Sequence, residues 1–156
     1  MNLRTRPTAS LLILPLVLVF CTPVITASID ESLPDAQALG QLELRAQQAS
    51  PRDQCFLYTE LVHTMTEIAG RQMRDGNIDQ ASATLKKVEQ YATLIHLNLA
   101  NDTKRLKNAE LLMHHTTYRL GEYLHQASSE DRPTLQATLK RLDQVHDELL
   151  AQLFSH

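Results

Sequence analysis

Two short stretches of the sequence pair a carboxylate with an imidazole at helical spacing. Glu60 stands three residues before His63 in "TELVH", and Glu122 stands three residues before His125 in "GEYLH". In helical bundles that hold two metal ions, two helices each contribute such a Glu-x-x-His pair, and the other two helices each contribute a glutamate. The two stretches therefore raise the hypothesis of an internal di-metal centre.

The phase of the surrounding helices argues against that hypothesis. In a helix with about 100° per residue, the inward direction around the first pair is set by its apolar residues, Tyr58, Val62, Met65 and Ala69. Glu60 and His63 lie roughly 140° to 160° from this direction, which places them on the water side. Glu122 and His125 lie at similar angles from the apolar face of their own helix. We therefore expect no internal metal centre and no cofactor.

Three other residues have side chains that could bind metal or react. Glu110 and His114 are four residues apart and share a helix face, which makes them candidates for a surface metal site, although a solvated face is the simpler interpretation. His146 lies close to the apolar stripe of the last helix and is expected to be a core-edge histidine that is hydrogen-bonded to a neighbour.

The sequence carries no HExxH, G-x-S-x-G, CxxC or glycine-rich phosphate-binding motif, so we do not expect an enzyme.

Cys55 is the only cysteine besides Cys21. Since Cys21 lies in the leader described below, the mature chain would have no intrachain disulfide. Cys55 lies in the first turns of a predicted helix and has three interpretations. It could be a small hydrophobe that is partly buried, an intermolecular thiol that bridges two chains, or a reactive thiol.

Apolar residues recur at spacings of three and four, and no segment after residue 30 alternates with period two, so the chain is predicted to be all-α. A first helix is expected over about 35–48. A second is expected to begin at Ser50 and Pro51 and to end near Arg74, because a hydroxyl cap and a proline start it and Gly76 follows it. A last helix is expected after "SSEDRP", with Ser129 or Asp131 as its cap.

Between these helices the rhythm of apolar residues runs from Ala81 to Tyr123 without a change of phase. It predicts one long central helix over about 78–126, on which the flanking helices fold back as antiparallel helical hairpins. Asp102 is the one charge on the stripe. The alternative is a break at Asn101–Thr103, which would give an up-and-down four-helix bundle with a short N-terminal helix.

The first 27 residues have the pattern of a secretory signal peptide: Arg4 and Arg6, an apolar run from Leu11 to about Ile25, and small residues at the end. We expect this segment to be removed, leaving a single helical domain over 28–156 in an exported protein, periplasmic or secreted. The run is too short for a membrane span. A lipid anchor at Cys21 is the alternative, although Phe20 is large for the position before a lipidated cysteine.

The formal net charge of the chain is −3, and loss of the two leader arginines would take it to −5. An acidic exported protein is not expected to bind nucleic acid. The one small basic run, Lys104, Arg105 and Lys107, is typical of a solvated helix face, and its alternative is a contact with an acidic partner or lipid headgroups.

Four stretches, "RDQCFLYTEL", "KNAELLMHHTTYRL", "SSEDRP" and "VHDELLAQL", resemble a group of uncharacterised exported helical proteins of acidobacterial type. The similarity spans about two thirds of the chain. It implies an exported all-helical protein without an assigned activity, and no functional residues carry over from it.

Apolar residues beside the main stripe indicate how such a protein would act. Leu94, Leu97, Leu111 and Leu112 widen the stripe beyond what flanking helices would cover, which predicts a helical partner, most simply a second copy of the chain. We therefore expect a non-enzymatic protein-interaction or scaffold module that self-associates. The alternative is an exported module that responds to metal or redox conditions through its histidines and Cys55.

Overall fold

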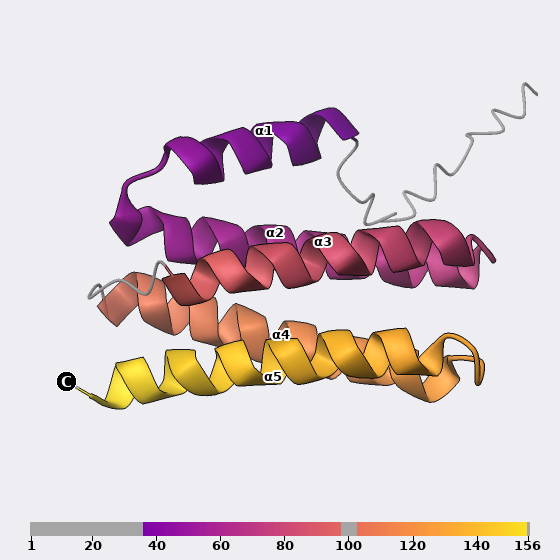
Figure 1. Cartoon of the computed structure of the whole chain (residues 1–156). Coiled ribbons are helices and arrows are strands. Elements are labelled where there is room, and N and C mark those ends of the chain that lie inside the picture. Colours follow the sequence, from indigo (N-terminus) through magenta and orange to yellow (C-terminus); the bar gives the residue numbers. More distant parts are fainter. Residues whose placement is uncertain (1–35, 98–102, 156) are drawn as a thin grey trace, which may run out of the picture. The chain divides into compact units, whose positions relative to one another are not determined.

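The computed structural model of the protein describes residues 36–97 and 103–155, which belong to one compact unit (Figure 1). These residues form five α-helices, and no strand occurs among them: α1 (Ala36–Gln48), α2 (Pro51–Arg74), α3 (Ile78–Leu97), α4 (Thr103–Gln126) and α5 (Arg132–Phe154). The all-α prediction is confirmed, and so are the expected ends of the second helix.

The helix ends form where the sequence supplies the required backbone chemistry. Ser50 precedes Pro51 at the start of α2, but its hydroxyl makes no capping bond to the backbone of α2 and instead donates a hydrogen bond of 3.0 Å to the carboxylate of Asp53. Gly76 ends the α2–α3 turn with φ +77°, a conformation that glycine adopts without steric penalty. Asp131 directly precedes α5, but its side chain makes no capping hydrogen bond to α5; its backbone N–H donates to the hydroxyl of Ser128 at 3.2 Å.

Side-chain contacts fix the directions of α2, α3 and α4. Between α2 and α3, Gln72 accepts a hydrogen bond from Thr84, and the ring of Tyr58 stacks on Tyr91, so residue numbers run in opposite directions. Between α2 and α4 they run together, because Asp53 pairs with Arg105 and Glu67 pairs with Arg119. The helix α2 therefore lies antiparallel to α3 and parallel to α4.

These contacts show that the prediction of one continuous helix over 78–126 is wrong. Gln72 and Glu67 are five residues apart on α2 and contact Thr84 and Arg119, respectively. In a straight helix Thr84 and Arg119 would be about 52 Å apart, whereas Gln72 and Glu67 are separated by only about 8 Å along their axis. The chain must reverse between α3 and α4. The connection itself, with Leu99, Asn101 and Asp102, lies outside the described residues.

The observed architecture is a four-helix bundle with a short N-terminal helix, as the alternative predicted, and its helices alternate in direction along the chain (Figure 1). In the described part of the chain, however, consecutive α3 and α4 are not neighbours, as they would be in a simple up-and-down bundle. Thr138 and Arg141 of α5 contact Glu89 and Thr93 of α3, so α3 and α5 are parallel neighbours. The helices α3 and α4 share no contact among the described residues and occupy diagonal positions. The bundle therefore places α4 between α2 and α5.

The predicted stripes form the core. Nearly every residue that the apolar rhythm pointed inward is buried, including, in α3 and α4, Ala81, Leu85, Val88, Ala92, Ile95, Leu106, Ala109, Met113, Thr116, Leu120 and Tyr123. In the described part of the chain, every buried threonine hydroxyl has a hydrogen-bond partner in its own helix or in a neighbouring one. For example, Thr66 donates to the carbonyl of Val62, and Thr138 donates to the carboxylate of Glu89 at 2.7 Å. The polar atoms in the core therefore carry no unpaired burial penalty.

The short helix α1 packs on α2 outside the four-helix bundle. Ala46 is fully buried at this contact, and Leu39 and Leu42 are half-buried against the core. Because α2 is covered by α1, α3 and α4, it has a wider buried sector than a single stripe predicts.

The expected signal peptide over 1–27 and the possible lipid anchor at Cys21 lie outside the described residues. None of the described helices is long and apolar enough to cross a membrane.

Candidate functional sites

The two Glu-x-x-His pairs do not converge, as the helical phase predicted. Glu122 pairs with Arg119 on its own helix at 2.6 Å, and His125 is exposed in the last turn of α4. The placement of His63 on the water side was wrong, because its ring lies against α4 and its Nδ1 is 3.0 Å from the hydroxyl of Thr116. The reason is that α2 packs against α4 as well as α3. A hairpin of α2 and α3 alone would leave the side of α2 that carries His63 exposed to water.

Glu110 and His114 do come together with a third residue, His146 of α5. The Nε2 atom of His146 lies 3.0 Å from Glu110 Oε1, and the His114 and His146 rings have centroids 5.4 Å apart. The predicted role of His146 as a core-edge histidine with a hydrogen-bonded neighbour is confirmed. No group of three His, Cys, Asp or Glu side chains in the described part of the chain has an arrangement that could hold a metal ion.

A second histidine pair lies on the other side of α4. The ring of His115 is 5.3 Å from that of His63, measured between centroids. Since His114 and His115 are neighbours in the sequence, one leans toward α5 and the other toward α2. The sequence showed the adjacent histidines, but their partners are defined only by the neighbours of α4 in the bundle.

Cys55 lies in the core, with 2% of its surface exposed. Burial raises the pKa of its thiol to about 11. A thiol in this setting is protonated at neutral pH and is a poor nucleophile. The structure therefore agrees with the interpretation of Cys55 as a small buried hydrophobe, and a bridge between two chains would require local opening of α2.

A polar network that sequence reasoning missed joins α2 to α4. Arg119 donates from Nε and Nη2 to the two carboxylate oxygens of Glu67 at 3.0 Å and 3.3 Å, and the Tyr123 hydroxyl donates to Glu67 at 2.7 Å. Burial raises the pKa of Glu67, but the hydrogen bonds from Arg119 and Tyr123 outweigh it and leave that pKa below its usual value. The spacing of Arg119 and Tyr123 by four residues was the only signal of this network in the sequence.

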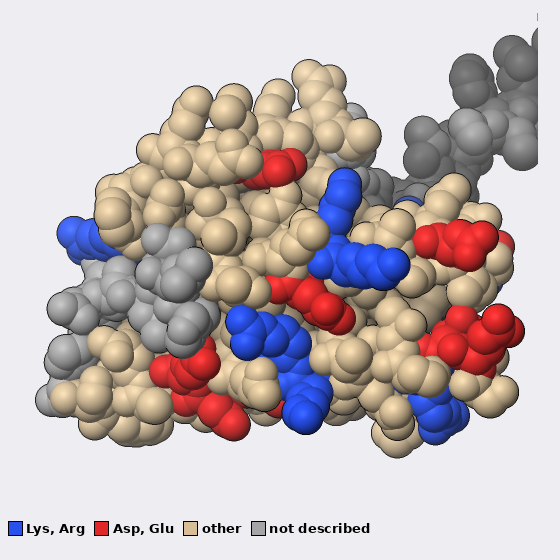
Figure 2. All heavy atoms as spheres, viewed as in Figure 1, with Lys and Arg blue, Asp and Glu red and all other residues tan. Residues whose placement is uncertain are grey.

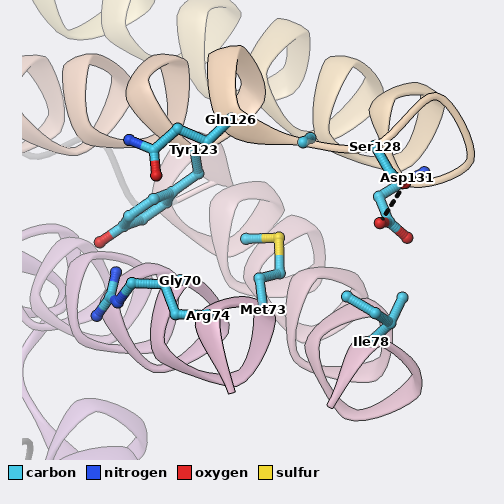
Figure 3. Close-up of a pocket in the computed structure, with 9 residues that line it drawn as sticks. Gly70, Met73, Arg74, Ile78, Tyr123, Gln126, Ser128 and Asp131 are labelled. Carbon is cyan, nitrogen blue, oxygen red and sulfur yellow. Dashed lines mark hydrogen bonds between the residues drawn. The ribbon is translucent and has the colours of Figure 1, made fainter. Parts of the chain in front are cut away.

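Beside this network lies a cavity of about 300 Å³ at the end of the bundle, where the α2–α3 and α4–α5 turns meet (Figure 3). Its walls are Gly70, Met73, Arg74, Ile78, Tyr123, Gln126, Ala127, Ser128 and Asp131. The guanidinium of Arg74 lies 5.7 Å from the centre of the Tyr123 ring, and the Ser128 hydroxyl donates to Asp131. The lining is mostly apolar. Its two polar pairs are Arg74 with Tyr123 and Ser128 with Asp131, and within each pair the two side chains contact each other.

Gly70, in the wall of this cavity, leaves the space that the Tyr123 ring occupies. A Cβ atom at Gly70 would lie 2.2 Å from Cζ of Tyr123, a distance that forces the ring to move. Figure 3 shows the Tyr123 side chain extending from α4 toward Gly70 and Arg74 of α2. Glycine at this position thus allows the two helices to approach closely enough for the Tyr123 hydroxyl to reach Glu67.

The outer face of α4 carries two large exposed apolar side chains. Leu111 is 64% exposed and Tyr118 is 63% exposed, whereas Leu94 and Leu112, which were predicted to add to the surplus, are half-buried. The side chain of Leu97 lies outside the described part. Of the four predicted surplus leucines, the structure therefore exposes Leu111, and Tyr118 adds to it on α4. The other large exposed apolar side chains that the structure describes, Leu44, Ile78 and Phe154, lie on α1, α3 and α5.

Charged residues are scattered over the surface. Blue and red side chains are interspersed among uncharged ones on the face in Figure 2, and red spheres gather near the turns that end the bundle. In the predicted basic run, Arg105 pairs with Asp53 at 3.1 Å and lies over the ring of Phe56, while the side chain of Lys104 lies outside the described part. Arg105 of this run is thus engaged with α2.

Comparison with protein-family models, with curated proteins and with solved structures gave no match to this chain. The resemblance to exported helical proteins therefore stays a prediction.

Proposed function

We propose that this protein is a non-enzymatic interaction module that associates with itself through the outer surface of its bundle. The observation that supports this proposal is the exposure of large apolar side chains on regular, well-packed helices, above all Leu111 and Tyr118 of α4. Leu111 and Tyr118 lie two turns apart on one face of α4, and apolar area gathered on one surface is typical of contact sites between proteins. A helix face of this kind is suited to a second helix.

Sedimentation equilibrium of the mature chain, from about one to a few hundred micromolar, tests the proposal. A reversible increase in mass from monomer to dimer with concentration is the expected result. A chain that stays monomeric over the whole range would contradict it.

We also propose that the chain is exported after removal of a leader. The support is the pattern of Arg4 and Arg6, the apolar run and the small residues near position 27. Expression of the full chain in a bacterial host, followed by mass determination of the product from the envelope fraction, tests this proposal. Cleavage near Ala27 is expected, whereas an intact chain that stays in the cytoplasm would contradict export.

The approach of His146 to Glu110 and His114 favours a second candidate function, the surface binding of Zn²⁺ or Cu²⁺. Binding would require both imidazoles to turn toward one ion and Glu110 to give up its present hydrogen bond. Calorimetric titration with each metal would separate the two functions. Heat that disappears in His146→Ala would support the metal site, and the absence of heat at tens of micromolar metal would exclude it.

A further inference from the structure

Six side chains of α4 are arranged symmetrically about the peptide bond between His114 and His115. Leu111 stands three residues before His114, and Tyr118 stands three residues after His115. One turn further out, Lys107 and Glu122 are each seven residues from the nearer histidine. The order along the helix is therefore cation, apolar, histidine pair, apolar, anion.

All six side chains lie on one face. At about 100° per residue they fall within a sector of roughly 100°, whose centre points away from the buried residues Ala109, Met113 and Leu120. The exposures agree, since Lys107, Leu111, His114, His115 and Tyr118 are exposed and the side chain of Glu122 is 37% exposed. We call these six residues the α4 stripe.

From this pattern we infer that the α4 stripe is the face through which two copies of the chain associate, with the two α4 helices antiparallel. A two-fold axis through the 114–115 position sets Leu111 opposite Tyr118 of the second copy, and Lys107 opposite Glu122 of the second copy. Each contact then occurs twice, as a two-fold interface requires. This inference rests on the proposed function and names its surface.

Charge selects the antiparallel arrangement over the parallel one. In a parallel pair with the same centre, Lys107 would face Lys107 and Glu122 would face Glu122, which places like charges together at both ends. In the antiparallel pair each lysine faces a glutamate. The energy of such exposed pairs is small, but the difference between attraction and repulsion is sufficient to select one orientation.

The bundle leaves the stripe accessible and holds its centre in place. The helices α2 and α5 flank α4, and His63 and His146 lie beside His115 and His114 at the edges of the stripe. Leu111 and Tyr118 protrude between these two histidine pairs. The stripe is about 22 Å long, and a single helix face is smaller than the roughly 800 Å² per partner of a tight dimer. We therefore expect association in the micromolar range.

Sedimentation equilibrium of the mature chain and of five variants tests the inference. Leu111→Ser and Tyr118→Ser are each expected to raise the dimer Kd about tenfold or more, because they remove the apolar centre. Leu44→Ser is the matched control, since Leu44 is 52% exposed on α1, away from the stripe. It is expected to leave the Kd unchanged. All variants are expected to fold, because the substituted side chains lie at the surface. Thermal melting followed by circular dichroism checks this.

The charge reversal decides the orientation. Lys107→Glu alone is expected to weaken the dimer several-fold, because it opposes Glu122 of the second copy, and the double variant Lys107→Glu with Glu122→Lys is expected to restore it. If Lys107→Glu alone leaves the Kd unchanged, the antiparallel orientation is wrong, because only a parallel pair exchanges one like-charge contact for another. Glu122→Lys also removes the pair with Arg119, so the single variant decides the orientation. If the chain dimerises but Leu111→Ser and Tyr118→Ser leave the Kd unchanged, the surface is wrong and the proposed function stands. If the unaltered chain never dimerises, both fail.

Discussion

Gly70 and Tyr123 show how much of the packing between α2 and α4 depends on one missing side chain. The Tyr123 ring occupies the space that a Cβ at Gly70 would take, and its hydroxyl reaches Glu67 across the interface. The same hydroxyl accepts a hydrogen bond from Arg119 at 3.0 Å. A change at Gly70 therefore acts on the whole polar network and not only on the local contact.

We predict that Gly70→Ala lowers the free energy of unfolding by about 1–3 kcal/mol, because the Tyr123 ring must move away from α2. Urea denaturation followed by circular dichroism measures the effect. The matched control is Gly40→Ala in α1, where nothing lies within 4 Å of an added Cβ. This control should be neutral or stabilising, by up to about 1 kcal/mol. Equal stability of the two variants would show that the close approach is not required.

Cys55 gives a second prediction at the residue scale. Because its thiol is buried and its pKa is raised to about 11, a thiol reagent at neutral pH should modify the folded protein far more slowly than the protein unfolded in guanidinium. The rate of colour release from an aromatic disulfide reagent measures this difference. Rapid labelling of the native protein at the rate of a free thiol would show that α2 opens around Cys55.

The helix termini show the strongest agreement between local sequence and structure. Gly76 adopts a positive φ at the end of α2, and the chain turns there into α3. The backbone N–H groups of Asp75, Gly76 and Asn77 donate to carbonyl groups in the last turn of α2. The turn is therefore specified by residues within a few positions of it.

We predict that Gly76→Ala destabilises the bundle by about 1 kcal/mol, because alanine pays a steric penalty in the left-handed region. Gly121→Ala, within helical α4, is the opposite case and should stabilise by about 0.5–1 kcal/mol, since nothing lies within 4 Å of its added Cβ. Thermal melting of both variants measures the two shifts. A neutral or stabilising effect of Gly76→Ala would contradict the assignment of Gly76 as the turn residue.

At the scale of the whole molecule, the network around Glu67 links folding to pH. Its pKa is lowered in the folded state, so its contribution to stability is fully present above the ordinary glutamate pKa and is lost as the pH falls through the lowered value. Glu67 regains its ordinary pKa only when α2 and α4 separate, because its hydrogen-bond donors Arg119 and Tyr123 lie on α4.

We predict that Glu67→Gln reduces the free energy of unfolding at pH 7 by about 1–2 kcal/mol, because the charge-assisted hydrogen bonds from Arg119 are weakened. The gap between the two proteins should narrow as the pH falls below about 4.5. Urea denaturation at a series of pH values from neutral to acidic measures this gap. A gap that stays constant over the series would mean that Glu67 does not have a lowered pKa.

The sequence alone determined that the chain is all-α, where α2 begins and ends, and which residues of each helix face inward. The turn chemistry at a helix end and the three-four rhythm act within a few residues, so Gly76 and Met113 report on them without knowledge of the rest of the fold.

Only the tertiary structure decided the reversal between α3 and α4, and with it the neighbours of each helix. A stripe that keeps its phase is compatible with one long helix or with two helices, because each must turn an apolar face inward. The reversal places α4 beside α2 and α5, which gives His63 a partner in Thr116, joins Glu67 to Arg119, and brings His146 to Glu110. Such contacts depend on which helices become neighbours, and long-range packing in the bundle sets this arrangement.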